Sequence, residues 1–249
     1  MTVAVVAAHP AFRVACAELP HSSRLVEDPR GAVVVTAGSG DDMRRAVEQG
    51  AVAIVVVRPE SALPEFEPPV VVDRALLRAD LVADARSEDA PVLVQVEASS
   101  DADDAATTLR DAIGWARVLA GAPLTVRARQ GAHGDLSALF DAQRPGGPVV
   151  PVALVVTVRP GTAPWLRATA VGPERREVVV DVARGLARLE RTTADGRLLA
   201  PTRWEAPARL ALRRAVEATR GSAPDDLAEW NHDDARAGEL VSPRAGATR

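Results

Sequence analysis

A loop rich in glycine and hydroxyl groups, residues 36–40 (Thr-Ala-Gly-Ser-Gly), follows a strongly apolar run and precedes a helical pattern. In open α/β sheets, ligands bind beyond the carboxyl ends of the strands. Bare backbone and hydroxyl groups at such a place can bind a phosphate. Thr36, Gly38 and Ser39 are therefore candidate cofactor-binding residues. The alternative is an ordinary connecting loop, because loops of this composition are common.

A second candidate loop, residues 7–12 (Ala-Ala-His-Pro-Ala-Phe), follows the first apolar run of the chain. Pro10 is suited to the first position of a helix, and the amides after it could bind an anion. A dinucleotide-binding fold places a glycine-rich turn here, because glycine lets the backbone approach a pyrophosphate. This loop contains no glycine. His9 is a candidate cofactor-binding residue, and a plain strand-to-helix turn is the competing interpretation.

The other reactive residues form no recognised catalytic or metal-binding pattern. The four histidines are not at metal-ligand spacing from one another or from Cys16, the only cysteine, so no metal site is predicted. The chain contains neither a Gly-x-Ser-x-Gly motif nor a phosphate-binding P-loop. Glu27 and Asp28 lie near the place of a ribose-binding carboxylate. Only three residues separate Asp28 from the next apolar run, so we interpret this segment as a surface turn.

Composition excludes several classes of protein. Of the 249 residues, 47% are hydrophobic and 26% are charged, which excludes a disordered chain. The net charge of −4 and the absence of tyrosine argue against a nucleic-acid-binding surface. The apolar runs are too short to span a membrane, and no charged region precedes the first of them. We therefore expect a cytoplasmic protein in a reducing compartment that binds neither nucleic acid nor a membrane.

The first part of the chain predicts a parallel sheet of about five strands. Continuous apolar runs indicate strands buried on both faces, at residues 2–7, 31–36, 51–58, 70–73 and 91–98. A helix is predicted from Asp41, as N-cap, to Gln49, with Gly50 as its stop. Residues 24–29 are either a further strand or a turn.

After Gly121 the pattern changes to shorter runs separated by glycine, proline and aspartate, which indicates a mostly antiparallel sheet. Ala194-Asp195-Gly196 predicts a hairpin, and two helical patterns close the chain. The predicted fold is α/β, with a truncated Rossmann-like parallel sheet followed by an α+β domain. The expected divisions are a nucleotide-binding-type domain over 1–98, an α+β domain over 99–241 and a flexible tail over 242–249.

Taken in order, several segments resemble the Gfo/Idh/MocA family of nicotinamide-dependent oxidoreductases. Residues 25–36 are similar to the family's stretch ending in a strand and Thr-Pro. The helix that reaches Gln49-Gly50 and the strand ending at Val57-Arg58-Pro59 are similar to its segment that closes with Glu-Lys-Pro. Residues 111–121 are similar to its helix ending in Trp-Leu-Leu-Gly. The likeness covers most of residues 30–60 and 105–240.

The resemblance also implies which functional residues have changed. The glycine-rich turn is replaced by residues 7–12, and the second strand and helix of the nucleotide-binding half are implied to be deleted. Arg58 occupies the place of the family's lysine, and Asp111 that of its catalytic histidine. Arg58 and Asp111 are thus the candidate catalytic residues. Arginine is too basic to exchange a proton near neutral pH, and aspartate is normally a much weaker base than histidine.

Three functions remain open. The chain is a degenerate member of this family with hydride transfer and NAD(P) binding weakened or lost, an active divergent NAD(P)-dependent oxidoreductase acting on a sugar or polyol-like substrate, or an unrelated α/β binding or assembly protein. We expect the cofactor to be absent or a weakly bound NAD(P), with a small molecule as ligand. A homodimer is expected through the second-domain sheet, because Trp165, Leu166 and residues 178–180 are apolar enough to require cover on its open face.

Overall fold

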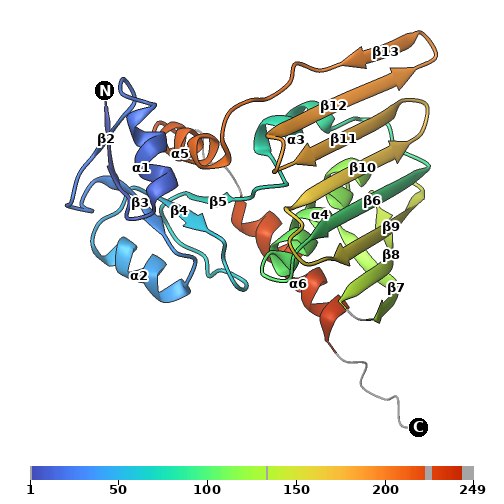
Figure 1. Ribbon diagram of the computed structural model, residues 1–249, viewed down its shortest axis with the longest axis horizontal. Helices are drawn as coiled ribbons and strands as arrows, with labels where there is room; N and C mark the ends of the chain where they lie inside the picture. The colour runs from blue at the N-terminus through green and yellow to red at the C-terminus, as the bar shows by residue number, and fades with distance from the viewer. Residues whose placement is uncertain (1, 133, 222–225, 243–249) are drawn as a thin grey trace. The chain divides into compact units, whose positions relative to one another are not determined.

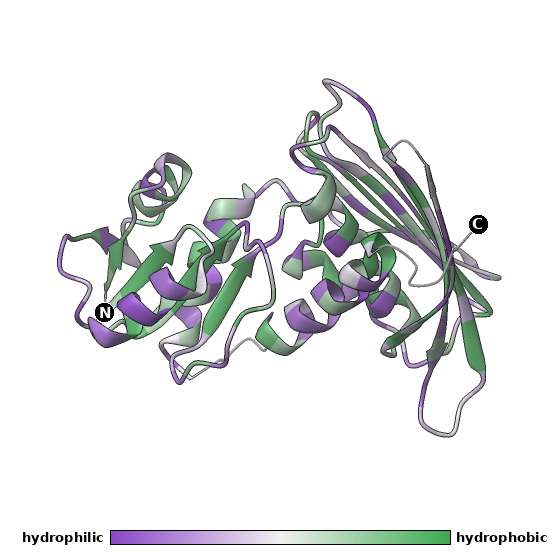
Figure 2. Ribbon diagram, turned by 90° about the horizontal axis from the view of Figure 1, so that it is seen from below, coloured by the Kyte–Doolittle hydropathy of each residue, from purple (hydrophilic) through white to green (hydrophobic). Residues whose placement is uncertain are grey.

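Five parallel strands form the first of two sheets in the computed structural model, which describes residues 2–132, 134–221 and 226–242 (Figure 1). Their order across the sheet is β2-β1-β3-β4-β5. The strands are β1 (Val3–Val6), β2 (Ser23–Leu25), β3 (Ala32–Thr36), β4 (Ala53–Val57) and β5 (Val70–Asp73). This confirms the predicted Rossmann-like parallel sheet. Figure 2 shows its central strands as strongly hydrophobic, as expected of strands covered on both faces.

The second strand of this sheet is present, contrary to the deletion that the resemblance implied. β2 has three residues and pairs in parallel with β1. Residues 26–31 then connect β2 to β3 without a helix. Within this connection, the carboxylate of Asp28 accepts a hydrogen bond from the backbone amide of Arg30 (3.0 Å), which is the geometry of a turn. The interpretation of Asp28 as a turn residue is therefore confirmed.

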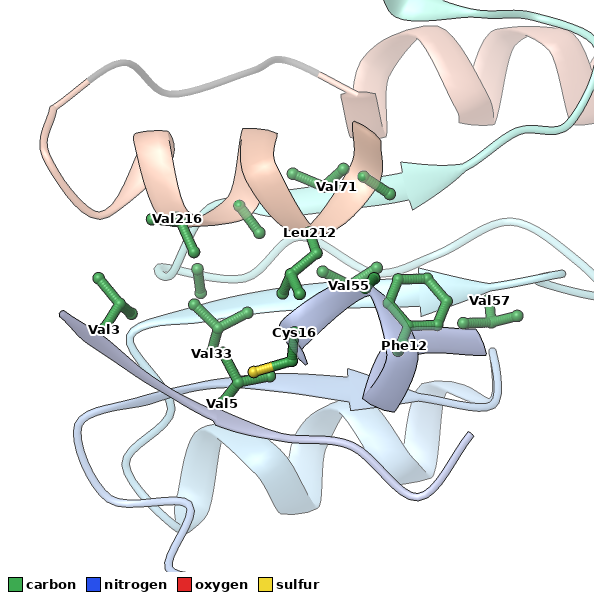
Figure 3. Packing of buried hydrophobic residues seen from close by; sticks show 14 residues of the cluster. Val3, Val5, Phe12, Cys16, Val33, Val55, Val57, Val71, Leu212 and Val216 are labelled. Carbon is green, nitrogen blue, oxygen red and sulfur yellow. The ribbon is translucent and has the colours of Figure 1, made fainter. Parts of the chain in front are cut away.

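Helices cover both faces of the first sheet. On one face, α1 (Pro10–Ala17) and α5 (Pro207–Ala218) pack against the strands, and Figure 3 shows Leu212 of α5 among the buried side chains there. On the other face, α2 (Gly40–Glu48) and the first residues of α6 (Asp226–Val241) contribute Met43 and Trp230 to a second buried cluster. Residues near the C-terminus thus complete a core that residues near the N-terminus begin.

The second sheet has eight strands in the order β13-β12-β11-β10-β6-β9-β8-β7. All neighbouring strands are antiparallel except β6 and β9, which confirms a mostly antiparallel sheet. Figures 1 and 2 show α3 (Ala79–Ala85) and α4 (Ala105–Ala120) on one of its faces. The strands are β6 (Leu93–Ser100), β7 (Leu124–Ala132), β8 (Asp135–Gln143), β9 (Val149–Val158), β10 (Trp165–Val171), β11 (Arg175–Asp181), β12 (Leu186–Thr193) and β13 (Gly196–Leu199). β12 and β13 form the predicted hairpin.

The run at 91–98 was expected in the first sheet, and this expectation was wrong. As β6 it lies inside the second sheet, between β10 and β9. Val94 and Val96 are buried, whereas Gln95 and Glu97 are exposed, so only one face of this strand is covered. Polar side chains at every second position are typical of such a strand and are already visible in the sequence.

The chain forms two compact units, and their boundaries differ from the expected division at residues 98 and 241. The first unit contains residues 1–78 and 205–231, and the second contains residues 79–204 and 232–249. The difference arises because α5 and the start of α6 return to the first sheet. Of the tail expected over 242–249, residues 243–249 lie outside the described residues, as does His133.

The uncovered face of the second sheet carries only some of the side chains that the dimer prediction named. Leu166, Val178 and Val180 are buried, at 0%, 0% and 3% exposure, and therefore lie on the helix-covered face. Trp165 and Val179 alternate with these residues and are partly exposed on the other face, where Arg167 and Glu177 form an ion pair (2.7 Å). Other exposed apolar side chains of this sheet lie on β8 and β9 (Leu139, Val149 and Val155), on β10 (Val171) and on β13 (Leu198 and Leu199). The homodimer stays a prediction.

A buried ion pair fixes α4 to the second half of α6 within the second unit. Both carboxylate oxygens of Asp233 accept hydrogen bonds from Arg117, at 2.9 Å from Nε and 3.2 Å from Nη2. Asp233 is fully buried, and the Arg117 side chain is 12% exposed. Beside it, the Nε2 atom of His232 accepts a hydrogen bond from the backbone amide of Leu124 (3.3 Å). Burial lowers the pKa of this histidine. The imidazole is accordingly neutral and acts as an acceptor.

Candidate functional site

The four candidate cofactor-binding residues and Arg58 lie at one edge of the first sheet. β1, β3 and β4 are parallel and paired in register, so their carboxyl ends meet at this edge. His9 follows β1, Thr36 ends β3, Gly38 and Ser39 follow it, and Arg58 follows β4. The prediction that these loops lie at the carboxyl ends of the first-sheet strands is thus met by the topology.

Gly38 is required by the close approach of two backbone segments. Its φ is +93°, in the region that favours glycine. A Cβ placed on Gly38 would lie 2.8 Å from the carbonyl oxygen of Val57 and 2.9 Å from the Cα of Pro59. The space beside this glycine is therefore filled by the chain itself. The local structure explains Gly38 without any ligand.

Substituting alanine for Gly38 tests this structural role. We expect Gly38→Ala to lower the free energy of unfolding by about 1–3 kcal/mol, because both the backbone conformation and the Val57 carbonyl oppose a methyl group. Urea denaturation followed by circular dichroism measures the change. Gly31→Ala is the matched control, since Gly31 has φ +69° but no atom within 4 Å of its Cβ position. Equal losses in the two variants would show that the close approach contributes nothing.

The two hydroxyl groups of this loop are also engaged by the protein. The Oγ of Ser39 accepts the backbone amide of Asp42 (3.1 Å), so Ser39 is the N-cap of α2. The predicted cap, Asp41, lies inside the helix instead, because the helix begins two residues earlier than expected. Thr36 is 7% exposed, and its hydroxyl donates to the carbonyl of Val55 (3.5 Å). The predicted stop, Gly50, follows the helix with φ +84°, as expected.

The N-terminus of α1 offers few donors to an anion. His9 is the N-cap and its side chain forms no capping hydrogen bond; its ring lies edge-on against Phe12, with 5.9 Å between ring centroids. The first helical residue, Pro10, has no amide hydrogen. The amides of Phe12 and Arg13 both donate to the carbonyl of His9, at 3.1 and 3.2 Å. In the first turn, the amide of Ala11 is therefore the donor that remains for a phosphate. A dinucleotide-binding turn offers several backbone amides at this place.

Arg58 has an unusual backbone conformation. Its φ is +48°, which makes it the one residue other than glycine with positive φ in the described parts of the chain. A left-handed conformation costs a residue with a side chain about 1–2 kcal/mol. Backbone strain of this kind is concentrated at functional sites. The conformation projects an exposed arginine at the carboxyl edge of the first sheet.

Asp111, the other candidate catalytic residue, lies in the middle of α4 and is fully buried. Its helix neighbours Thr108 and Trp115 are buried as well. A carboxylate without solvent exposure cannot accept a proton from a freely diffusing substrate in this conformation. Asp111 belongs to the second unit and Arg58 to the first, so a shared catalytic role for the two residues stays a prediction.

The second unit contains a pocket that none of the candidate residues lines. Three of its lining side chains are arginines, Arg86, Arg117 and Arg144, from segments far apart in the sequence. The sequence patterns do not predict this site, because no regular spacing connects the three arginines. The nearest signal in the sequence is Gly121, after which the pattern changes and beside which the pocket lies.

The described residues contain neither a helix suited to span a membrane nor a cluster suited to bind a metal. None of their helices is long and apolar enough to cross a membrane. No group of three or more histidine, cysteine, aspartate or glutamate side chains is arranged to hold a metal ion in residues 2–132, 134–221 and 226–242.

Comparison with known proteins gives similarity in structure and none in sequence. No family model and no curated protein matches the sequence. The structure superposes on an oxidoreductase from Sinorhizobium meliloti with a TM-score of 0.74 and 12% identity, covering 97% of both chains. For a UDP-N-acetylglucosamine 3-dehydrogenase from Acidithiobacillus ferrooxidans the TM-score is 0.68, with 13% identity and 96% of both chains covered.

A protein described as a myo-inositol dehydrogenase from Sinorhizobium meliloti also matches, with a TM-score of 0.58 and 15% identity. The match covers 97% of this chain and 88% of the dehydrogenase. At such low identity the similarity concerns the fold. The order of elements, a parallel sheet followed by a large mostly antiparallel sheet, is the order that the sequence resemblance implied. The chain therefore has the fold of the Gfo/Idh/MocA oxidoreductases.

Proposed function

We propose that this chain is a Gfo/Idh/MocA-type protein in which NAD(P) binding and hydride transfer are weakened or lost. The observation that carries the proposal is the N-terminus of α1, where Pro10 lacks an amide hydrogen and the amides of Phe12 and Arg13 bind the carbonyl of His9. A dinucleotide needs its pyrophosphate at this place, against bare backbone amides. The residues present do not fit that group.

The neighbouring loop supports the same conclusion. The hydroxyls of Thr36 and Ser39 form hydrogen bonds with the protein's own backbone. The space beside Gly38 is occupied by the backbone at the end of β4 and just after it. The chain's own contacts thus account for all three residues without a nicotinamide cofactor. The connection from β2 to β3 also lacks a helix, and the carboxylate of Asp28 binds the Arg30 amide. These contacts stabilise the loops in the absence of a nucleotide.

The chain's residues also suit proton transfer poorly. The sequence contains no lysine at all, so its 30 basic residues other than histidine are arginines. Arginine side chains bind or orient anions and do not serve as general acids, so this is the role open to Arg58. Asp111 is fully buried. A hydride transfer to or from an alcohol requires a group that takes or gives the hydroxyl proton, and neither candidate meets that requirement.

Titration calorimetry with NADH and with NADPH tests the proposal. We expect no saturable binding below about 1 mM, which corresponds to a binding free energy weaker than about −4 kcal/mol. Glycine substitution of the first turn is the companion experiment: Pro10→Gly restores one amide donor and should increase any residual binding. Micromolar binding of either nucleotide by the unmodified chain would overturn the proposal.

The second candidate is an active oxidoreductase with a sugar or polyol-like substrate. It is favoured by the similarity in fold to a UDP-N-acetylglucosamine 3-dehydrogenase and by the strained backbone at Arg58. In that case Arg58 would bind an anionic or hydroxyl-rich substrate, and Asp111 would require a conformation in which it is accessible. Micromolar nucleotide binding in the calorimetry would favour this candidate. The cytoplasmic location and the homodimer are parts of both proposals.

A further inference from the structure

A pocket of about 660 Å³ lies within the second unit, beside the C-terminal end of α4. Arg117, at the last turn of α4, and the αL residue Gly121 form one side. Arg86 and Ser87, which follow α3, and Arg144 with Pro145, which follow β8, also line it. The volume lies in the range of pockets that bind small metabolites. All of these residues belong to one compact unit.

Arg144 is held rigidly by three backbone carbonyls. Its Nε donates to Ala120 (3.3 Å), its Nη1 to Glu88 (2.6 Å) and its Nη2 to Ser87 (3.1 Å). A guanidinium has five N–H groups, so two remain for another acceptor. A Cβ at Gly121 would collide with this guanidinium, so the glycine makes room for it. The arginine is thus placed before any ligand arrives, which lowers the entropic cost of binding one.

Arg144 forms no direct ion pair with a carboxylate among the described residues, since all its hydrogen bonds there are to carbonyl oxygens. The C-terminal end of a helix such as α4 carries roughly half a negative charge, which balances only part of a guanidinium. Arg117, by contrast, is paired with Asp233.

The surroundings of Arg144 add further positive charge. Glu174 is shared between two arginines, at 3.7 Å from Arg176 and 3.6 Å from Arg191. Burial lowers the pKa of Arg176, and the charges of Arg191 and Arg144 lower it further, whereas those of Glu174 and Asp89 raise it. Positive groups that destabilise one another in this way are stabilised by a nearby anion.

We propose that this pocket binds a small metabolite through a phosphate or carboxylate group, with Arg144 and Arg86 as the anion-binding side chains. A planar guanidinium with two parallel N–H groups matches both kinds of oxyanion. Val118, Ala122, Pro123 and Pro145 give the pocket apolar walls for the rest of the molecule. The site is separate from the carboxyl edge of the first sheet and does not depend on the proposed loss of nucleotide binding.

Calorimetry with inorganic phosphate and with succinate tests this site and distinguishes the two anionic groups. We expect saturable binding of one of them with one ion per chain, at an ionic strength kept constant with sodium chloride. Arg144→Gln and Arg86→Gln should each weaken that binding by at least about tenfold, the usual loss for a charge-assisted hydrogen bond. Arg184→Gln is the control, because the Arg184 side chain is 80% exposed and does not line the pocket.

Arg144 also stabilises the end of α4, so its variant is compared with the unmodified chain by circular dichroism before titration. If Arg144→Gln does not fold, Arg86→Gln is the variant used for the test. Arg86 lies outside the regular helices, so its substitution disturbs the fold less. Absence of binding for both anions, or equal weakening in Arg184→Gln, would overturn the proposal. If the unmodified chain binds NADH, loss of that binding in Arg86→Gln would assign it to this pocket, and unchanged binding would assign it to the first sheet.

Discussion

Replacing Asp233 by alanine is expected to lower the free energy of unfolding of the second unit by about 3–5 kcal/mol. Asp233 is fully buried and accepts two hydrogen bonds from Arg117, whose side chain is 12% exposed. Removal of the carboxylate leaves a guanidinium in a site that water reaches poorly, and this cost exceeds the loss of the pair's own attraction. Urea denaturation followed by far-ultraviolet circular dichroism measures the change.

Asp141→Ala is the matched control for this prediction. Asp141 and Arg127 also form an ion pair, but their atoms are 3.7 Å apart and their side chains are 40% and 66% exposed. Exposed pairs contribute less than about 1 kcal/mol, so the control should unfold close to the unmodified chain. If Asp233→Ala costs no more than Asp141→Ala, the buried pair does not stabilise the unit in the way described here.

Leu212→Ala is expected to lower the free energy of unfolding of the first unit by about 2–5 kcal/mol. Leu212 is fully buried and lies among Phe12, Val33 and Val55 in the cluster under α5 (Figure 3). The substitution removes buried apolar surface and leaves a cavity that rigid strands on one side fill only partly. Hydrogen exchange of the amides in β3 and β4 should become faster, because these strands lose their cover.

The control for Leu212→Ala is Val14→Ala, on α1 of the same unit. Val14 is 59% exposed, so its truncation should change the free energy of unfolding by less than about 0.5 kcal/mol. Amide exchange in β7 and β8, which belong to the second unit, is an internal reference in both variants. Equal acceleration of exchange in the two units would contradict the assignment of α5 to the first core.

The local patterns of the sequence predict most elements of this fold, and they fail where contacts distant in sequence decide the outcome. Apolar runs buried on both faces correctly predict β1, β3, β4 and β5. β6 has a similar run, but it joins the other sheet because its Gln95 and Glu97 require an uncovered face. The return of α5 to the first sheet has no local signal, since an amphipathic helix can cover any apolar surface.

The candidate site is predictable in its position and not in its chemistry. The loops after β1, β3 and β4 lie at one sheet edge because parallel strands end together. Whether a glycine or hydroxyl there binds a ligand depends on what else approaches it. Gly38 meets the chain at Val57, and Ser39 caps its own helix. These contacts join residues brought together by folding, so the sequence pattern is the same with or without a ligand-binding role.

The arrangement of the first unit also affects how the chain folds as it is synthesised. Residues 1–78 leave the ribosome early, yet the helix that covers one face of their sheet lies at 207–218. At about 5–20 residues per second, synthesis of residues 79–204 takes on the order of 6 to 25 s. During this interval Val5, Val33 and Val55 lack the cover of Leu212 and its neighbours. The nascent chain therefore exposes an aggregation-prone apolar surface, and the first unit reaches its native state only after residues 79–204 of the second unit have been made.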